Sequence, residues 1–516
     1  MNRARVLLLI AKGLLASVIS IGMLLPAYSQ TSWFSGATPH EDAWLALKIL
    51  GDAESQGLNP QDYRVAELLT AFEAVQRGTA HVGTQEQLDD ALTNALLRYL
   101  SDLNDGRLSP QELKHRFKAP ADQPFDAYGY LASARNAGNL AQALAVAQPD
   151  VPMYEAVRQA MNRYRAMGDH PAWQLSFPPM PARSLKPGEL WDGVPLLAAR
   201  LQAVGDLDLT YTAGLQYDVP MVEAVKRFQE RHGLEPDGVV GVATLAQINV
   251  TPAQRVKQMA LTLERLRWTP LLHGPRMIVV NIPEFILRAY ELKGRQVELD
   301  LEMRVVVGRA LDTRTPIFLE DMRFIEFSPY WNVPISIARK ETLPRMRRDP
   351  DYFYREGFEF VTRDGAVVGV LSGEGIDAVQ RGEWRIRQRP GPRNALGDIK
   401  FIFPNDQNIY LHHTPSPQLF TRARRDFSHG CIRVEAPVEL AQFVLRNQPE
   451  WTTERIREAM GGGISRTLRL QEVIPVLITY STVVVKNGGK VYFFPDIYKQ
   501  DALLEQALQS RRPPSP

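Results

Sequence analysis

The sequence of 516 residues contains a single cysteine, Cys431, and nine histidines. One thiol excludes an internal disulfide and a thiolate zinc site, and the histidines do not form the HExxH pattern of zinc proteases. An excess of one charge is also lacking, because 60 Lys and Arg residues face 58 Asp and Glu residues, for a formal net charge of +2. We therefore expect no nucleic-acid partner, no metal and no cofactor.

Long apolar runs are lacking after the first thirty residues. Arg3 and Arg5 precede VLLLIAKGLLASVISIGMLLPA, and the small residues of AYS predict a signal peptide over residues 1–29, cleaved before Gln30. Lys12 leaves the run shorter than the about 20 residues of a spanning helix, which disfavours the alternative of a retained anchor. We expect a periplasmic protein with no membrane span after signal removal. A lone thiol kept in an oxidising compartment favours chemistry over packing.

Hydrophobic patterning divides the mature chain into units. Residues 30–185 carry apolar residues at three- and four-residue spacing, as in LDDALTNALLRYLSDL, which predicts a helical scaffold domain. The proline-rich FPPMPARSLKPG marks a boundary, and residues 188–252 predict a small three-helix module. Short β-branched and aromatic runs predict a β-rich domain over 275–480, followed by a C-terminal extension, 481–516. The predicted fold class is multidomain α+β.

A long segment interrupts the β-rich domain. Between YWNVP and RQRPGPRNALGDIKF, residues of about 335–386 have mixed helical character. An interruption of this length favours a helical lid over a surface embellishment. Its cations are expected either to meet carboxylates of a substrate or to form a solvated face: Arg339, Lys340, Arg345, Arg347 and Arg348.

The cysteine lies in FSHGC, nineteen residues after His412 in NIYLHHTP. A strand there places Tyr410 and His412 on one face and His413 on the other. An imidazole within hydrogen-bond reach removes the proton of a thiol and makes a nucleophile for acyl transfer. Gly430 allows a sharp turn whose amides point at a developing oxyanion. Spacing alone leaves a buried structural cysteine as the alternative.

Several strings agree in their order with one family. IYLHHTP followed by FSHGCIRVE resembles the His…[Ser/Thr]-His-Gly-Cys signature of the L,D-transpeptidases, whose catalytic module is the YkuD domain. PYWNVPISIARKETLP and RQRPGPRNALGDIKFIFPN resemble the multidomain YcbB-like branch. AVKRFQERHGLEPDGVVGVATL resembles the peptidoglycan-binding domain of cell-wall enzymes. The resemblance covers most of the mature chain.

The resemblance implies a role for individual residues. Cys431 matches the nucleophile, and His412 matches the base and later proton donor, which the carbonyl of the next residue orients. Arg433 stands where many relatives have Asn, so the contact that its side chain makes is undecided. Either of the adjacent histidines, His412 or His413, could be the base, and the alternation of side chains along the strand favours His412. Further motif positions, assigned to the oxyanion hole and its surroundings, are Ser428, His429, Gly430 and Arg433. Residues assigned to substrate binding are Tyr410, His413, Trp331 and Asn332.

The implied reaction is acyl transfer through a thioester, from a tetrapeptide stem to a diaminopimelate amine, which forms a 3–3 cross-link and releases D-Ala. Expected partners are peptidoglycan stems and glycan, and other cell-wall synthesis enzymes; carbapenems are expected inhibitors. Two alternatives remain: an L,D-carboxypeptidase or endopeptidase that uses the same Cys-His pair, and a non-catalytic wall-binding scaffold. The acceptor stays open between a second stem, a lipoprotein lysine and a D-amino acid.

Overall fold

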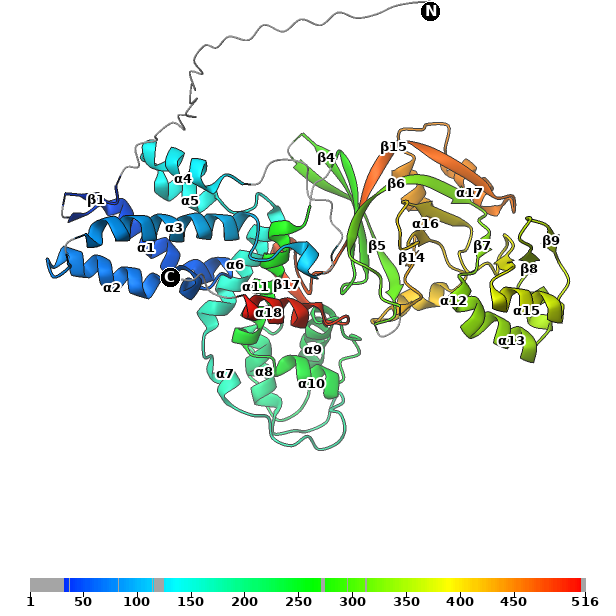
Figure 1. Cartoon of the computed structure of the whole chain (residues 1–516). Helices are drawn as coiled ribbons and strands as arrows, with labels where there is room; N and C mark the ends of the chain where they lie inside the picture. The colour runs from blue at the N-terminus through cyan, green and yellow to red at the C-terminus, as the bar shows by residue number, and fades with distance from the viewer. Residues whose placement is uncertain are drawn as a thin grey trace, which may run out of the picture.

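The computed structural model describes residues 32–511, apart from 37, 82, 114, 116–124, 271–273, 295 and 311–312. The expected signal peptide lies outside the described residues. A helical body and a β-sheet body lie next to each other, and the small module, which contains α8 (Val194–Ala203), α9 (Val219–Arg231) and α10 (Val242–Ile248), lies below the helical body in the view of Figure 1. No helix of the described ranges is both long and apolar enough to cross a membrane.

The helical body packs around one apolar core. Its longest helix, α3 (Thr84–Asn104), buries Leu88, Leu92 and Leu96, as the helical period requires. A later helix, α11 (Pro252–Trp268), adds Met259 to this core. The other principal helices are α1 (Glu41–Gly51), α2 (Val65–Gln76), α4 (Ala127–Asn136), α5 (Leu140–Val146) and α6 (Pro152–Met167).

The small module has a separate core built on α8, α9 and α10. Helix α9 begins where the Asp218 side chain accepts a hydrogen bond from the Met221 amide. Leu185 pairs with Val240 and is fully buried in this core. The sequence-based boundary at residue 185 stays a prediction, and an isolated bridge such as this one carries no local pattern in the sequence.

The β-rich domain is a nine-stranded sheet in the order β13-β5-β14-β12-β11-β6-β15-β3-β4, and β4 also pairs with β5. This additional pairing closes the sheet on itself. Strands β12 and β14 run parallel, between antiparallel neighbours. The strands are β3 (Arg276–Asn281), β4 (Ile286–Lys293), β5 (Gln296–Gly308), β6 (Phe318–Phe327), β11 (Ile399–Ile402), β12 (Leu411–His412), β13 (Asp426–Ser428), β14 (Ile432–Val434) and β15 (Arg466–Thr479).

The insertion forms a small subdomain with its own core, at the far end of the β-sheet body (Figure 1). The insertion contains helices, as predicted, together with a four-stranded sheet, β7-β10-β8-β9, that the sequence did not predict. These strands are too short to show a clear alternation in the sequence. The elements are β7 (Trp331–Asn332), α12 (Ile335–Ile337), the π-helical turn η4 (Ala338–Thr342), α13 (Leu343–Arg348), α14 (Asp351–Arg355), β8 (Phe358–Val361), β9 (Val367–Val368), α15 (Gly373–Arg381) and β10 (Arg385–Gln388).

The C-terminal segment leaves the sheet and returns to the helical body. A hairpin of β16 (Val483–Lys486) and β17 (Lys490–Phe493) is followed by α18 (Gln500–Ser510). Phe493 is buried in the core of the helical body. In Figure 1, α18 lies beside α11, between the helical body and the small module. Val483 and Val491 of the segment belong to the same core of the helical body.

Candidate active site

Two adjacent parallel strands carry the candidate catalytic residues. The register of β12 and β14 pairs Leu411 with Ile432 and His412 with Arg433, and the Ile432 amide donates to the Tyr410 carbonyl at 3.1 Å. Leu411 and Ile432 are fully buried in the core on one face. Because side chains alternate along a strand, the opposite face presents a constellation of four residues. These are Tyr410, His412, Cys431 and Arg433.

The imidazole of His412 is fixed and neutral. Its Nδ1 lies 2.5 Å from the carbonyl oxygen of His413, a distance at which Nδ1–H donates and Nε2 keeps its lone pair. The side chain is buried, and burial, reinforced by the charge of Arg433, lowers the pKa of His412 to about 3. At neutral pH, His412 can therefore accept a proton at Nε2.

The thiol of Cys431 is half-buried and packs at the edge of the sheet core. Its Sγ lies 3.6 Å from the carbonyl oxygen of Asn408. Burial raises the pKa of Cys431 above its ordinary value, although hydrogen bonds from Tyr410 act in the opposite direction. The resting group is thus a thiol, which lies on the same strand face as a neutral imidazole. The raised pKa disfavours a resting thiolate.

The loop before the thiol is held by the hydroxyl of Ser428. This hydroxyl accepts from the Gly430 amide at 3.1 Å and donates to the Cys431 carbonyl at 2.5 Å. Gly430 has a φ of 116°, which side chains with a Cβ rarely adopt. The Gly430 amide is therefore occupied, whereas the Cys431 amide has no hydrogen-bond acceptor among the described residues. The Cys431 amide is the donor available to an oxyanion.

Two cations lie close to the thiol. Arg433 interacts electrostatically with Cys431, and its buried Nε has no hydrogen-bond partner in the described part of the chain. The ammonium of Lys400 lies 4.2 Å from the ring centre of Tyr410 and 3.7 Å from a carboxylate oxygen of Glu326. Arg433 thus places a guanidinium on the same strand face as the thiol.

The insertion reaches the motif through His429. Nε2 of His429 lies 2.6 Å from Oε1 of Glu341, which belongs to the π-helical turn η4. The sequence did not single out Glu341, because no local pattern reports a contact across 88 residues. One wall of the site is therefore formed by the insertion.

The other predicted residues lie elsewhere. His413 Nδ1 is 3.4 Å from a carboxylate oxygen of Asp398, and only its carbonyl serves His412. Trp331 and Asn332 form β7, paired with β10, and the Trp331 ring lies 6.4 Å from the ring of Phe358 in the core of the insertion. No contact recorded among the described residues brings Trp331 or Asn332 to the thiol.

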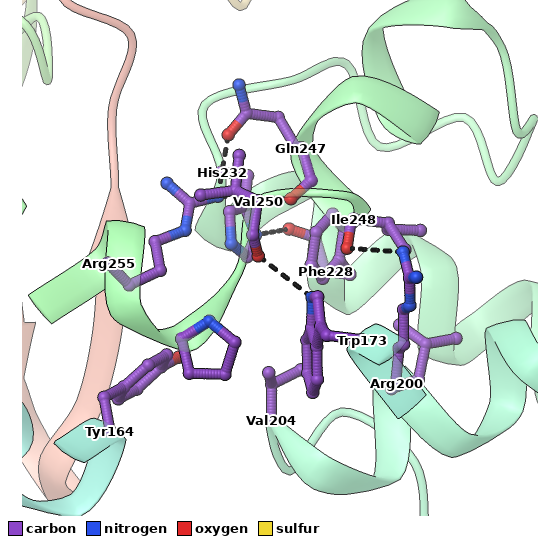
Figure 2. A pocket seen from close by; sticks show the side chains of 12 residues that line it. Tyr164, Trp173, Arg200, Val204, Phe228, His232, Gln247, Ile248, Val250 and Arg255 are labelled. Carbon is purple, nitrogen blue, oxygen red and sulfur yellow. Dashed lines mark hydrogen bonds between the residues drawn. The ribbon is translucent and has the colours of Figure 1, made fainter. Parts of the chain in front are cut away.

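A hollow lies between the helical body and the small module, away from Cys431 (Figure 2). Trp173 Nε1 donates to the Val250 carbonyl at 3.1 Å, and Arg255 donates to the Gln247 side chain at 2.8 Å. His232 is fully enclosed, and burial lowers its pKa well below the ordinary value. Because these polar groups bond one another, the hollow is a joint between the two units.

Comparison with known families assigns each unit. Residues 275–462 match the YkuD L,D-transpeptidase catalytic domain, residues 27–161 match a scaffold domain, and residues 192–248 match a "Putative peptidoglycan binding domain". A "Putative L,D-transpeptidase" of Haemophilus influenzae is 33% identical over 266 residues, which cover 52% of this chain and 51% of that protein. The match thus spans about half the length of this curated relative.

Two other matches are weaker. "Epoxide hydrolase 1" of Sus scrofa is 27% identical over 85 residues, 16% of this chain and 19% of that protein. Among solved structures, an L,D-transpeptidase of Xylanimonas cellulosilytica covers 58% of this chain and 100% of its own, with 15% identity and a TM-score of 0.18. Neither match carries an argument about function.

The chain therefore carries an L,D-transpeptidase catalytic domain of the YkuD family. A peptidoglycan-binding domain and a scaffold domain accompany it on the same chain. The predicted family and the mixed α+β fold class are confirmed.

Proposed function

We propose that this protein is a peptidoglycan L,D-transpeptidase that forms 3–3 cross-links through a thioester on Cys431. The observation that carries the proposal is the shared strand face of Cys431 and His412, with the imidazole held by the His413 carbonyl. A neutral base with a fixed donor at Nδ1 is the arrangement that general-base activation of a thiol requires.

The reaction proceeds in two acyl transfers. His412 Nε2 takes the thiol proton while Sγ attacks the carbonyl that joins the third stem residue to the terminal D-Ala. The oxyanion accepts from the Cys431 amide, the C–N bond breaks, and His412 returns its proton to the leaving amine. An amine of a second stem, deprotonated by His412, then attacks the thioester and releases the thiol. Arg433 pairs with a carboxylate of the stem.

The remaining domains bring this chemistry to the wall. The peptidoglycan-binding domain holds glycan or stems, and the protein works in the periplasm after export. The insertion covers the bound stem, since Glu341 already contacts His429 at the site. A covered thioester is shielded from water, which favours the amine acceptor.

Defined tetrapeptide muropeptides test the proposal. Incubation with the purified protein should give 3–3 linked dimers and free D-Ala, read by mass, and Cys431→Ser should give neither. Monomeric tripeptides alone would instead identify a carboxypeptidase. The absence of any turnover would favour the alternative of a non-catalytic wall-binding scaffold.

A small lactam tests the nucleophile by itself. A carbapenem should acylate Cys431, because its strained carbonyl requires only the thiol, the base and the oxyanion donor. Intact mass should rise by one drug unit in the wild type and stay unchanged in Cys431→Ser. An unmodified wild type would remove the main support for a competent nucleophile.

A further inference from the structure

The C-terminal segment contacts the catalytic domain at Gly308 and Thr315 on its way back to the helical body. Tyr498 lies between β17 and α18, and it is 1% exposed. Its hydroxyl donates to the Gly308 carbonyl at 2.6 Å and accepts from the Thr315 amide at 3.2 Å. Burial raises the pKa of Tyr498 to about 12, so the hydroxyl keeps the proton that it donates.

Thr315 extends this contact to the residue before the thiol. Its Oγ1 accepts from the Gly308 amide at 2.9 Å and donates to the Gly430 carbonyl at 2.7 Å. The backbone is closely packed here, since a Cβ on Gly308 would lie 2.0 Å from the Thr313 carbonyl oxygen. Two hydrogen-bonded side chains, Tyr498 and Thr315, thus lead directly to the peptide that precedes Cys431.

The other end of the segment is anchored on the helical body. The Tyr498 amide donates to the Tyr480 hydroxyl at 2.9 Å, and that hydroxyl donates to Asp496 at 2.7 Å. Asp501 at the start of α18 accepts from Arg265 of α11 at 2.5 Å. The Asp501 amide donates to Asp496 at 3.0 Å, so a continuous set of hydrogen bonds joins a helix of the helical body to the nucleophile loop.

We propose that Tyr498 and Thr315 are positioning residues, through which the docked C-terminal segment holds the Gly430–Cys431 peptide in its reactive orientation. This inference rests on the proposed function, because the reactive orientation is that of acyl transfer to Cys431. The loop carries the Cys431 amide, for which the described part of the chain supplies no acceptor, so a small rotation of this peptide moves both the sulfur and the oxyanion donor. Such misplacement lowers the rate of the chemical step more than substrate binding.

The test uses the full-length protein with tetrapeptide stems and four substitutions. Thr315→Val removes the hydroxyl with little change of shape, and Thr315→Ser keeps it. Tyr498→Phe removes only the phenolic oxygen. The matched control is Tyr217→Phe, because Tyr217 is also fully buried and donates one hydrogen bond, to the Gly238 carbonyl at 2.6 Å, within the small module.

Thr315→Val and Tyr498→Phe should each lower kcat about tenfold or more with KM nearly unchanged, whereas Thr315→Ser and Tyr217→Phe should stay within about twofold of wild type. Iodoacetamide alkylation supplies a second readout that needs no substrate, since Cys431 is the only thiol. A loosened loop exposes the thiol, so the alkylation midpoint should move to lower pH in Thr315→Val and Tyr498→Phe alone.

Wild-type kcat and an unmoved alkylation midpoint in Thr315→Val and Tyr498→Phe would overturn the inference. So would an equal loss in Thr315→Ser and Thr315→Val, which would indicate a packing role. A wild type that never acylates would overturn the proposed function instead, and the alkylation profiles would still decide whether the two residues hold the loop.

Discussion

The ionisation of Cys431 and His412 distinguishes this site from a resting thiolate–imidazolium pair. Burial raises the pKa of the thiol and lowers that of the imidazole, so both effects favour the neutral pair. In the proposed mechanism, the thiol therefore stays protonated until substrate arrives and His412 accepts the proton. This state also protects a lone thiol from oxidation, which proceeds through the thiolate.

The two adjacent histidines should differ sharply in their effect on rate. His412→Ala removes the proton acceptor and should slow acylation by roughly 10²–10⁴-fold. His413→Ala keeps the carbonyl that holds Nδ1 and should act much less, because its ring faces Asp398. Stopped-flow acylation by a carbapenem measures both variants. A larger loss in His413→Ala would contradict the assignment of the base.

The pH dependence of acylation follows from the same two shifts. Because the pKa of His412 is lowered to about 3, the base stays neutral, and the rate should be flat from about pH 5 to pH 8. Alkylation should rise only above the ordinary pKa of a thiol. The lowered pKa also affects the stability of the fold. As the pH falls, His412 takes up a proton in the unfolded chain before it does so in the folded one, so its contribution to stability is present above pH 6.5 and is lost between about pH 6.5 and pH 3. A rate that falls with a midpoint near 6.5 would contradict the neutral-base assignment.

The face assignment of the site was predictable, and its ionisation was not. Alternation along NIYLHHTP placed Tyr410 and His412 together, and the register of β12 and β14 agrees with that alternation. The direction of a pKa shift depends on burial by distant segments, which no local pattern contains. The hydrogen bond from Ser428 to the Cys431 carbonyl is likewise a property of the folded loop.

Among the elements, the insertion was predicted as a segment but not as a structure. Its limits followed from YWNVP, which contains β7, and from RQRPGPRN, which begins within β10. Its small sheet was missed because β9 has two residues and β8 and β10 have four each, too few for a period to show. Two of its cations have partners within the insertion itself. Arg347 pairs with Asp377 at 2.8 Å, and Arg345 lies 4.1 Å from the ring centre of Tyr352.

The insertion should be removable without unfolding the catalytic sheet. Its core is separate from the sheet core, and its two ends are paired, with the Val333 amide donating to the Ile386 carbonyl at 3.0 Å. Replacing residues 335–384 by a short Gly/Ser loop should leave carbapenem acylation intact, lower cross-linking and raise the hydrolysed fraction. Product ratios with tetrapeptide stems measure this change. Wild-type rate and ratio in the shortened protein would show that the segment is not a lid.

A point substitution refines that experiment. Glu341→Gln weakens the contact with His429 and should move the product ratio in the same direction as the loop replacement. Its matched control is Glu383→Gln, which breaks an exposed pair with Arg381 on the same subdomain. Exposed pairs contribute little, so the control should keep the wild-type ratio.

At the scale of the whole molecule, the order of the units was visible in the sequence, and their contacts were not. The strings that indicated a helical region, a wall-binding module and a β-rich domain are local. The return of the C-terminal segment is a long-range event: Arg231 of α9 donates to the Val491 carbonyl, 260 residues away, at 2.6 Å. The segment that the sequence left as an extension connects three units.

The joint at Arg231 should determine how firmly the small module is held. Arg231 and Asp206 are buried and form an ion pair, and Arg231 also bonds the hairpin strand β17. Arg231→Met leaves a buried carboxylate without a partner, which should cost about 3–5 kcal/mol. The double variant with Asp206→Leu removes both charges and should recover most of that loss. Hydrogen exchange over residues 204–231 and 483–493 should rise in the single variant and fall back in the double one. Equal exchange in both variants would show that the lost bond to β17, and not the unpaired charge, loosens the joint.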